Sequence, residues 1–412
     1  MLDRRRFLTH MLQGTSLLAA GTAVPQFLAN TALAADAGRD TTLVVIEMTG
    51  GNDGLNTVIP YADDAYHKAR PTLRFTKEQV VRVSDYIGLH PRMRSFDRLL
   101  QKGWLGVVQG VGYPNPDRSH FESMDIWQSA DVRRRNNTGW IGRSVPDLQD
   151  RKGNVPVLQI GAQKLPLALQ GSPGGVVSIN DQHSYRLELG GGDRRQARRK
   201  LIETLANSPA TGEKNSLLQF VERRQVQTYT TLDRLQEILG KSGQQRAPFP
   251  FNSLGQKMQL IGRLIEQGFG TRVFYVSLDG FDTHANQSET HGRLLQELAD
   301  AVSTFFEGLE RSGQAKRVLV MTFSEFGRRA QENGSKGTDH GAASCLFVAG
   351  PAVKSGPVGS YPSLKELDAG DLKHNLDFRK LYATLLDDWL GCDSKAVLGD
   401  AFGHVDLLKP KA

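Results

Sequence analysis

The segment TLVVIEM, Thr42 to Met48, and the loop TGGNDGLN that follows it, Thr49 to Asn56, set the fold expected of this chain. A run rich in β-branched residues and closed by glycine predicts a buried strand. The glycines allow a tight turn that presents the carboxylate of Asp53 at the end of that strand. Asp53 is therefore a candidate metal ligand, although Asn-Asp-Gly is also an ideal sequence for an Asx turn.

Similar apolar runs recur along the chain, separated by helical patterns. Further strands are predicted at 105–111, 155–160, 272–278, 317–323 and 342–348. Helices are predicted at about 119–128, 254–266, 289–311 and 378–390. Strands that alternate with helices favour an α/β fold with a mostly parallel central sheet flanked by helices.

The N-terminus has the pattern of an export signal. Residues 3–8 (DRRRFL) contain an Arg pair followed one residue later by Phe-Leu, which is typical of a twin-arginine signal. An apolar stretch from Met11 to about Leu33 ends in the small residues that precede a cleavage point, so residues 1–34 are predicted to be the signal and 35–412 the mature domain. The alternative, a membrane anchor, is disfavoured by Pro25 and by neighbouring polar residues. We therefore expect a periplasmic or secreted protein, with the twin-arginine translocase as its partner during export.

Composition bounds the remaining functional classes. The formal net charge is +7, of which the signal contributes +2, and no nucleic-acid-binding motif is present. No later apolar run is long enough to span a membrane. Gly-rich loops and charged helical stretches at about 170–251 predict a helical and loop insertion or cap, in which the basic run 194–200 could meet an anionic surface or form a solvated helix face. An exported compartment would permit a disulfide between Cys345 and Cys392, but the apolar run around Cys345 favours a buried free thiol.

The second predicted strand is followed by Asp117-Arg118-Ser119-His120 at the start of a helix. A helix N-terminus stabilises anionic groups, so Ser119 is a candidate nucleophile and Arg118 a candidate for holding a phosphate or sulfate group. The alternative for Ser119 is an ordinary helix cap. His120 is either a metal ligand or a polar helix residue.

The segment Asp282-Thr283-His284 follows another predicted strand after a Gly-Phe turn. Side chains two residues apart in extended backbone point the same way, so Asp282 and His284 can share one metal. Gln287 and His291 are weaker candidates nearby, and Asp279 could compete for the ligand role.

Two further motifs complete the predicted site. Glu325 and Arg328 in SEFGR follow the strand predicted at 317–323. Glu325 is a candidate metal ligand and Arg328 a candidate for holding the substrate anion; the alternative is a simple ion pair between the two. Asp339 and His340 in TDHG supply a ligand pair, or one ligand and its orienting partner. Because ligands bind at the carboxyl ends of parallel strands, we expect these side chains to meet. Carboxylates with imidazoles indicate a divalent metal, with Zn or Mn favoured by the histidines and Mg or Ca left open.

Taken together, the twin-arginine signal and the motifs GGNDGLN, YPNPDRSHF, GFDTHANQ, SEFGRR and GTDHG resemble the exported family catalogued as domain of unknown function 1501. That family is similar to the alkaline phosphatase and sulfatase superfamily. The resemblance implies an alkaline-phosphatase-like α/β fold and a divalent-metal site. By position, it implies Asp53, Asp282, His284 and His340 as metal ligands and Ser119 as the nucleophile.

Two departures from the superfamily pattern matter. Ser324-Glu325 stands where members usually have Asp-His, which argues against a second metal site. The segment Pro114 to Arg118 has Pro where the modified residue of sulfatases should be, so formylglycine chemistry is disfavoured.

The function expected is an exported metal-dependent hydrolase of a small anionic phosphate or sulfate ester. A metal polarises the ester oxygen and activates Ser119 or water, while Arg118 and Arg328 hold the anion. The alternative is a non-catalytic binding protein at the cell surface, built on a degenerated enzyme scaffold. A weaker third hypothesis is a structural secretion factor that uses the basic run in the insertion.

Overall fold

The computed structural model describes residues 40–148, 154–161, 164–171, 176–179, 234–235, 249–250 and 252–410. The predicted signal at 1–34 and most of the predicted insertion at 170–251, including its basic run, lie outside these residues. The described elements belong to the unit that spans Asp40–Ala412.

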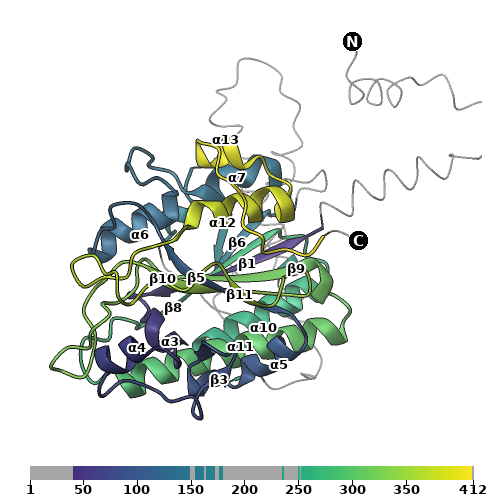
Figure 1. The fold of residues 1–412 in the computed structure, drawn as a ribbon. Helices are drawn as coiled ribbons and strands as arrows, with labels where there is room; N and C mark the ends of the chain where they lie inside the picture. The colour runs from purple at the N-terminus through teal and green to yellow at the C-terminus, as the bar shows by residue number, and fades with distance from the viewer. Residues whose placement is uncertain are drawn as a thin grey trace, which may run out of the picture. The chain divides into compact units, whose positions relative to one another are not determined.

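A nine-stranded sheet forms the centre of this unit (Figure 1). The strand order is β11-β5-β10-β9-β1-β8-β6-β7, and β12 pairs with β5. All pairings are parallel except those of β10, which runs antiparallel to both β9 and β5. The strands are β1 (Thr42–Thr49), β5 (Leu105–Gly112), β6 (Val157–Ile160), β7 (Val176–Ile179), β8 (Val273–Asp279), β9 (Val318–Phe323), β10 (Ser344–Ala349), β11 (Gly356–Val358) and β12 (Leu376–Asp377).

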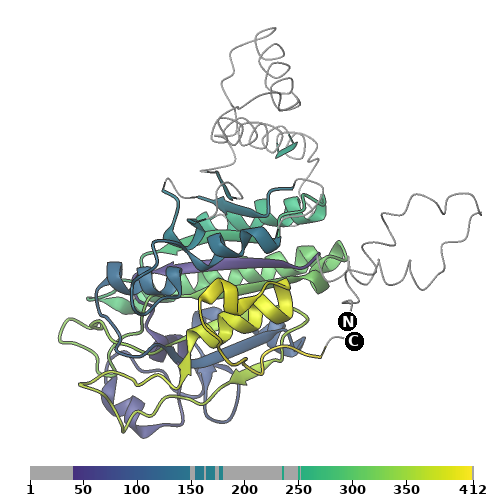
Figure 2. The same cartoon turned by 90° about the horizontal axis from the view of Figure 1, so that it is seen from above.

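Side-chain alternation along β1 divides the core into two layers. Val44 and Ile46 pack with helices α5 (Ser95–Gln101), α10 (Ser253–Glu266) and α11 (Gln287–Arg311) on one face of the sheet. Because successive side chains of a strand point to opposite faces, Leu43 and Val45 pack on the other face. Four helices cover that second face: α6 (His120–Ser129), α7 (Trp140–Leu148), α12 (Phe378–Thr384) and α13 (Ser394–Leu398). This second layer lies nearest the viewer in Figure 2.

Shorter elements surround this framework. The helices among them are α3 (Gly54–Thr57), α4 (Asp64–Ala69), the 3-10 helices η1 (Pro91–Met93), η2 (Leu167–Leu169) and η3 (Ala315–Arg317), and the π-helix η4 (Leu385–Leu390). A separate three-stranded sheet has the order β2-β4-β3, with β2 (Val58–Ile59), β3 (Val81–Arg82) and β4 (Gly88–Leu89).

The expected fold class is confirmed: the sheet is mostly parallel and flanked by helices, and the predicted strands and helices form with shifts of one or two residues at most of their ends. One difference is the antiparallel direction of β10, which no local pattern encodes. Another is the helix predicted at 378–390, which is divided into α12 and η4. A third is β7, which lies inside the range expected for the insertion yet pairs with β6 in the main sheet.

Two further expectations concern membrane-spanning segments and the state of the two cysteines. Within the described ranges, we find no helix with the length and apolar character that a membrane span requires. Cys345 and Cys392 are both free thiols, the first half-buried and the second buried. The preference for a free Cys345 over a disulfide is therefore confirmed, although its burial is only partial.

Candidate metal centre

Five motifs meet because of the direction of the central strands. β8, β1 and β9 are parallel neighbours, so the loops that follow them leave the sheet at the same edge. β10 runs the opposite way, so the segment that precedes it reaches that edge too. β5 is antiparallel to β10, so the segment that follows β5 and carries His120 also leaves at this edge. Gly50 brings the loop after β1 especially close, because a Cβ at this position would lie 2.4 Å from the backbone nitrogen of Asp282. Only glycine fits this approach, which also requires a φ of +119°.

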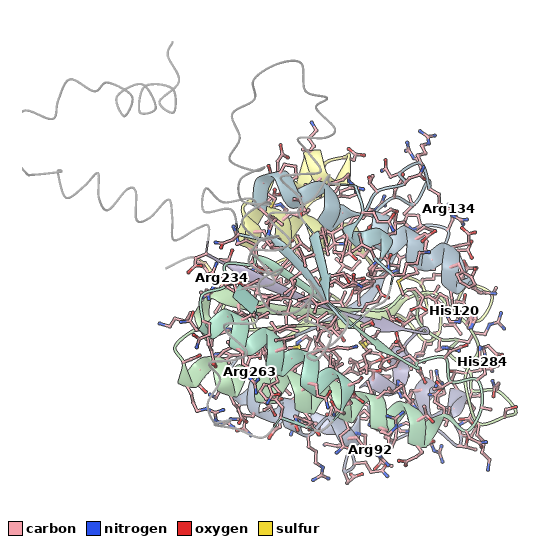
Figure 3. All side chains as sticks on the ribbon, turned by 180° about the vertical axis from the view of Figure 1, so that it is seen from behind. Arg92, His120, Arg134, Arg234, Arg263 and His284 are labelled. Carbon is pink, nitrogen blue, oxygen red and sulfur yellow. The ribbon has the colours of Figure 1, made fainter. Side chains whose placement is uncertain are left out.

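Three imidazoles surround one carboxylate at this edge. Asp282 Oδ1 lies 3.5 Å from His120 Nε2, 3.0 Å from His284 Nε2 and 3.4 Å from His340 Nε2. His120 and His284, which come from different parts of the chain, lie on the same side of the molecule in Figure 3. His120, Asp282 and His340 offer ligand atoms that all lie within 4.8 Å of one another, so this group can hold a metal ion. His284 Nε2 is 2.9 Å from His340 Nε2 and belongs to the same cluster.

An unsatisfied atom supports this interpretation. His120 Nε2 is buried and has no hydrogen-bond partner. Buried polar atoms are rarely left without a partner, and one that remains points to a missing ion or water. The residues present therefore fit a divalent metal of the kind that imidazole and carboxylate ligands bind.

The second nitrogen of each imidazole is held by another group. His120 Nδ1 lies 2.8 Å from Glu325 Oε1, His340 Nδ1 lies 2.8 Å from the carbonyl oxygen of Arg118, and His284 Nδ1 lies 3.4 Å from Asp339 Oδ1. Partners of this kind fix the orientation of a histidine and leave its Nε2 free to act as a ligand. Each Nε2 atom lies within 3.5 Å of Asp282 Oδ1, although His284 is not part of the His120, Asp282 and His340 group whose ligand atoms all lie within 4.8 Å of one another.

The electrostatic environment keeps the carboxylates ionised. Burial would raise the pKa of Glu325, but its hydrogen bonds, first the one from His120, hold that pKa below the ordinary value. The same hydrogen bond raises the pKa of His120. Burial also opposes ionisation of Asp282, yet the hydrogen bond and charge of Arg328 hold the pKa of Asp282 below its ordinary value. Both acids are thus available as acceptors at neutral pH.

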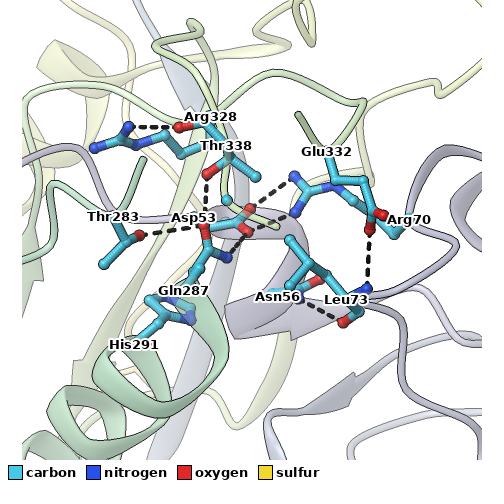
Figure 4. Close-up of polar contacts among 12 residues, drawn as sticks. Asp53, Asn56, Arg70, Leu73, Thr283, Gln287, His291, Arg328, Glu332 and Thr338 are labelled. Carbon is cyan, nitrogen blue, oxygen red and sulfur yellow. Dashed lines mark hydrogen bonds and ion pairs between the residues drawn. The ribbon is translucent and has the colours of Figure 1, made fainter. Parts of the chain in front are cut away.

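Asp53 lies in a different environment from this cluster. Both of its oxygens accept hydrogen bonds from Arg70, at 2.6 and 3.0 Å, and both side chains are fully buried (Figure 4). Gln287 donates a further hydrogen bond to Asp53, and its own Oε1 accepts one from Thr338. Burial would raise the pKa of Asp53, but Arg70 more than offsets that effect and the pKa is lowered. The carboxylate thus already has a full set of partners.

Arg328 is equally enclosed. Its side chain is fully buried and donates to the carbonyl oxygens of Gly50, Gly51 and Thr338. It also donates to Asp282 Oδ1 at 2.7 Å. These bonds tie three loops of the site together and direct the guanidinium at the ligand carboxylate. The guanidinium is therefore enclosed by protein groups and not exposed to solvent.

The segment before α6 presents the remaining predicted residues. Ser119 is the half-buried N-cap residue of α6, and its side chain makes no capping hydrogen bond, whereas its backbone nitrogen donates to Asp117 Oδ1 at 2.8 Å. The Arg118 side chain is 41% exposed and forms an ion pair with Asp371. The neighbouring Arg329 is 38% exposed and approaches Asp371 at 3.7 Å. Two partly exposed arginines therefore share one carboxylate beside the histidine cluster.

Two of the weaker candidates differ in their exposure to solvent. His291 is buried, with Nε2 3.0 Å from Asn52 Oδ1, and Asp279 is exposed at the end of β8. Sequence reasoning left His120 undecided between ligand and helix residue, and it did not identify Arg70, Arg329 or Asp371. Arg70 ends a short helix with no motif around it, and Asp371 lies far along the chain, so no local signal marks either one.

Among the comparisons with known proteins, the family match agrees with the family found in the motifs. No curated protein matches the chain. Among solved structures it is similar to the PsFucS1 sulfatase from Pseudoalteromonas sp., with 12% identity, a TM-score of 0.40, and coverage of 91% of this chain and 72% of that one. It is also similar to a protein in the alkaline phosphatase superfamily from Vibrio parahaemolyticus, with 12% identity, a TM-score of 0.40, and coverage of 90% and 71%.

A third similar structure is the lipoteichoic acid synthase LtaP from Listeria monocytogenes, with 9% identity, a TM-score of 0.36, and coverage of 78% of this chain and 68% of that one. Residues 106–406, well over half of the chain, match the family model described as "Protein of unknown function (DUF1501)". These residues contain every site motif except the loop after β1. The chain therefore belongs to the DUF1501 family.

Proposed function

We propose that this protein is an exported, metal-dependent hydrolase of phosphate or sulfate esters. The observation that carries the proposal is the convergence of three imidazole Nε2 atoms on Asp282 Oδ1, each imidazole being held through its other nitrogen. Three nitrogen ligands and one oxygen ligand favour Zn or Mn over Mg and Ca, which prefer oxygen.

In this proposal the ligands are His120, Asp282, His284 and His340. Glu325 and Asp339, expected as possible ligands, instead orient His120 and His284 through their Nδ1 atoms. Asp53 is assigned to the support of the site, because its oxygens are taken up by Arg70 and Gln287.

A divalent ion bound there would supply Lewis-acid polarisation of the ester and a lowered pKa for a bound hydroxyl or water. Ser119 is the candidate nucleophile, since its hydroxyl makes no cap bond and sits at the N-terminus of α6, where the helix dipole favours an anion. Arg118 and Arg329 are partly exposed, and we assign them to the substrate anion in place of the enclosed Arg328. Arg328 fixes the position of Asp282.

A second candidate function is a binding protein without turnover. Among the described side chains, none forms a hydrogen bond with the Ser119 hydroxyl that would let it accept the proton of this nucleophile. A serine nucleophile normally has such a base, unless a metal lowers its pKa. The lack of such a base means that either a metal activates Ser119 or the protein has lost catalysis. Measuring ester turnover distinguishes these two alternatives.

The first test is the metal content of the exported protein, purified without chelators, beside Asp282→Ala and a matched control, Asp279→Ala, which removes an exposed carboxylate at the end of the same strand. We expect one metal per chain in the wild type and the control, and none in Asp282→Ala. Metal retained by Asp282→Ala would overturn the ligand assignment.

The second test is turnover of p-nitrophenyl phosphate and p-nitrophenyl sulfate by the metal-loaded protein. We expect hydrolysis by the wild type and a loss of at least 100-fold in kcat for Ser119→Ala with its metal retained, in the range that a lost covalent or proton-transfer step costs. Stoichiometric metal with no hydrolysis of any ester, but with saturable phosphate or sulfate binding, would favour the binding protein.

A further inference from the structure

A buried carboxylate outside the histidine cluster is connected to it through Arg118. The Asp371 side chain is only 5% exposed, and its Oδ2 accepts hydrogen bonds from Arg118 Nε at 2.8 Å and from Nη2 at 2.5 Å. Asp371 Oδ1 is buried, has no hydrogen-bond partner and lies 3.7 Å from Arg329 Nε. Two hydrogen bonds from one guanidinium to one carboxylate hold the arginine in a fixed direction.

The main chain of Arg118 then contacts the histidine cluster directly. Its carbonyl oxygen lies 2.8 Å from His340 Nδ1, which is the hydrogen bond that directs His340 Nε2 at Asp282. The Nδ1 atoms of His120 and His284 face carboxylates, whereas Nδ1 of His340 faces the backbone carbonyl of Arg118 in the loop before α6. The orientation of His340 therefore depends on where that loop is held.

We propose that Asp371 is a positioning residue for the metal ligand His340, acting through the Arg118 side chain and its backbone carbonyl. The inference rests on the metal site of the proposed function. Asp371 itself lies in a turn closed by backbone hydrogen bonds with Asp368, so it is a firm anchor. Without the ion pair, the Arg118 carbonyl is free to move and His340 loses the partner that selects its Nε2 as the ligand atom.

The same anchor has a consequence for the substrate. Arg118 and Arg329 flank Asp371, so the residue that holds the His340 partner also holds two partly exposed arginines beside the site. Metal affinity and anion affinity should thus fall together when Asp371 is changed. A purely structural carboxylate would alter the free energy of unfolding without this joint effect.

The experiment measures the dissociation constant of Zn²⁺ by competition with a chromogenic chelator, for the wild type, Asp371→Asn, Arg118→Gln and the double variant. Asp368→Asn is the matched control, because Asp368 lies in the same turn but is exposed. Inorganic phosphate binding to the Zn²⁺-loaded proteins is measured alongside. Arg118→Gln changes a partly exposed side chain and leaves the backbone carbonyl in the chain, so it remains informative if Asp371→Asn fails to fold.

We expect each single variant to bind Zn²⁺ about 10- to 100-fold more weakly than the wild type, the range seen when an orienting partner of a ligand is removed. The double variant should be no weaker than the single ones, because both changes break the same connection. Arg118→Lys, which keeps one charged donor, should recover part of the affinity. Asp368→Asn should bind like the wild type.

The negative outcomes are distinguishable. A wild type that binds no Zn²⁺, Mn²⁺, Mg²⁺ or Ca²⁺ would overturn the proposed function itself. A wild type that binds Zn²⁺ together with variants of unchanged affinity would overturn only the role of Asp371. Additive losses in the double variant would also contradict it, since they would show that Asp371 and Arg118 act on the site independently.

Discussion

The buried ion pair between Asp53 and Arg70 gives a sharp test of which carboxylates bind the proposed metal. Asp53→Asn keeps the size of the side chain but removes its charge, which leaves a fully buried guanidinium without its counter-ion. Breaking a buried pair in this way lowers the free energy of unfolding by about 3–5 kcal/mol. At about 2 °C per kcal/mol for a chain of this size, the melting temperature should fall by roughly 6–10 °C.

Asp282→Asn should behave in the opposite way. The Asp282 side chain is 48% exposed, and Arg328 keeps its carbonyl acceptors when the charge is removed. We therefore expect a change of about 1 kcal/mol or less in the metal-free protein. The same substitution removes a proposed ligand, so bound metal should be lost from Asp282→Asn and kept by Asp53→Asn.

The assay combines urea unfolding of the metal-free proteins with metal analysis of the same preparations. An Asp53→Asn protein of unchanged stability that has lost its metal would refute the reasoning, because Asp53 would then be a ligand rather than the partner of Arg70. A third variant, Asp53→Leu with Arg70→Met, removes both charges. Replacing both partners of a buried pair by apolar residues is often close to neutral, so this variant should be more stable than Asp53→Asn.

Three further predictions follow from other parts of the molecule. Glu325→Gln should weaken Zn²⁺ binding about 10-fold or more, measured by chelator competition, because His120 Nδ1 loses its carboxylate partner. Burial lowers the pKa of His291 from 6.5 to about 4, so the unfolded chain binds a proton that the folded chain excludes. The free energy of unfolding therefore falls by up to about 3 kcal/mol as the pH drops from 6.5 towards 4. Urea unfolding at pH 7.5 and 4.5 should show a smaller fall for His291→Gln than for the wild type. Changing Arg4 and Arg5 together to Lys should leave the protein in the cytoplasm, as cell fractionation will report.

The edge of the sheet that holds the site could be predicted from the sequence because three of the strands that lead to it run in the same direction. β1, β8 and β9 are adjacent and parallel, so the motifs that follow them must share an edge. Their β-branched runs are strong local signals, and the buried side chains of β1 alternate between the two layers as such a strand requires. These are properties of short segments, which a single sequence carries well.

Other features depend on pairings that no short segment specifies. β10 is an apolar run whose direction is undetermined by its own residues, yet its antiparallel course is the reason why His340, in the segment before β10, reaches the same edge as His284. The partners of Asp53 and Arg118 are likewise set by tertiary packing. The sequence therefore identified Asp53 and Arg118 as candidate site residues, but only the folded chain shows that they form hydrogen bonds with Arg70 and Asp371.

The charges at this edge support one metal ion and an anionic ligand. Each carboxylate already faces a cation or an imidazole: Asp53 faces Arg70, Asp282 faces Arg328, Glu325 faces His120, and Asp339 faces His284. The buried Arg328 guanidinium lies 2.7 Å from Asp282 Oδ1, so this carboxylate already has one cationic partner. The carboxylates of Glu325 and Asp339 face imidazoles that are neutral when they bind a metal, so these two carboxylates balance the charge of a divalent ion among the histidines. Attraction for an anionic ester would then come from the partly exposed Arg118 and Arg329, which share the single carboxylate of Asp371.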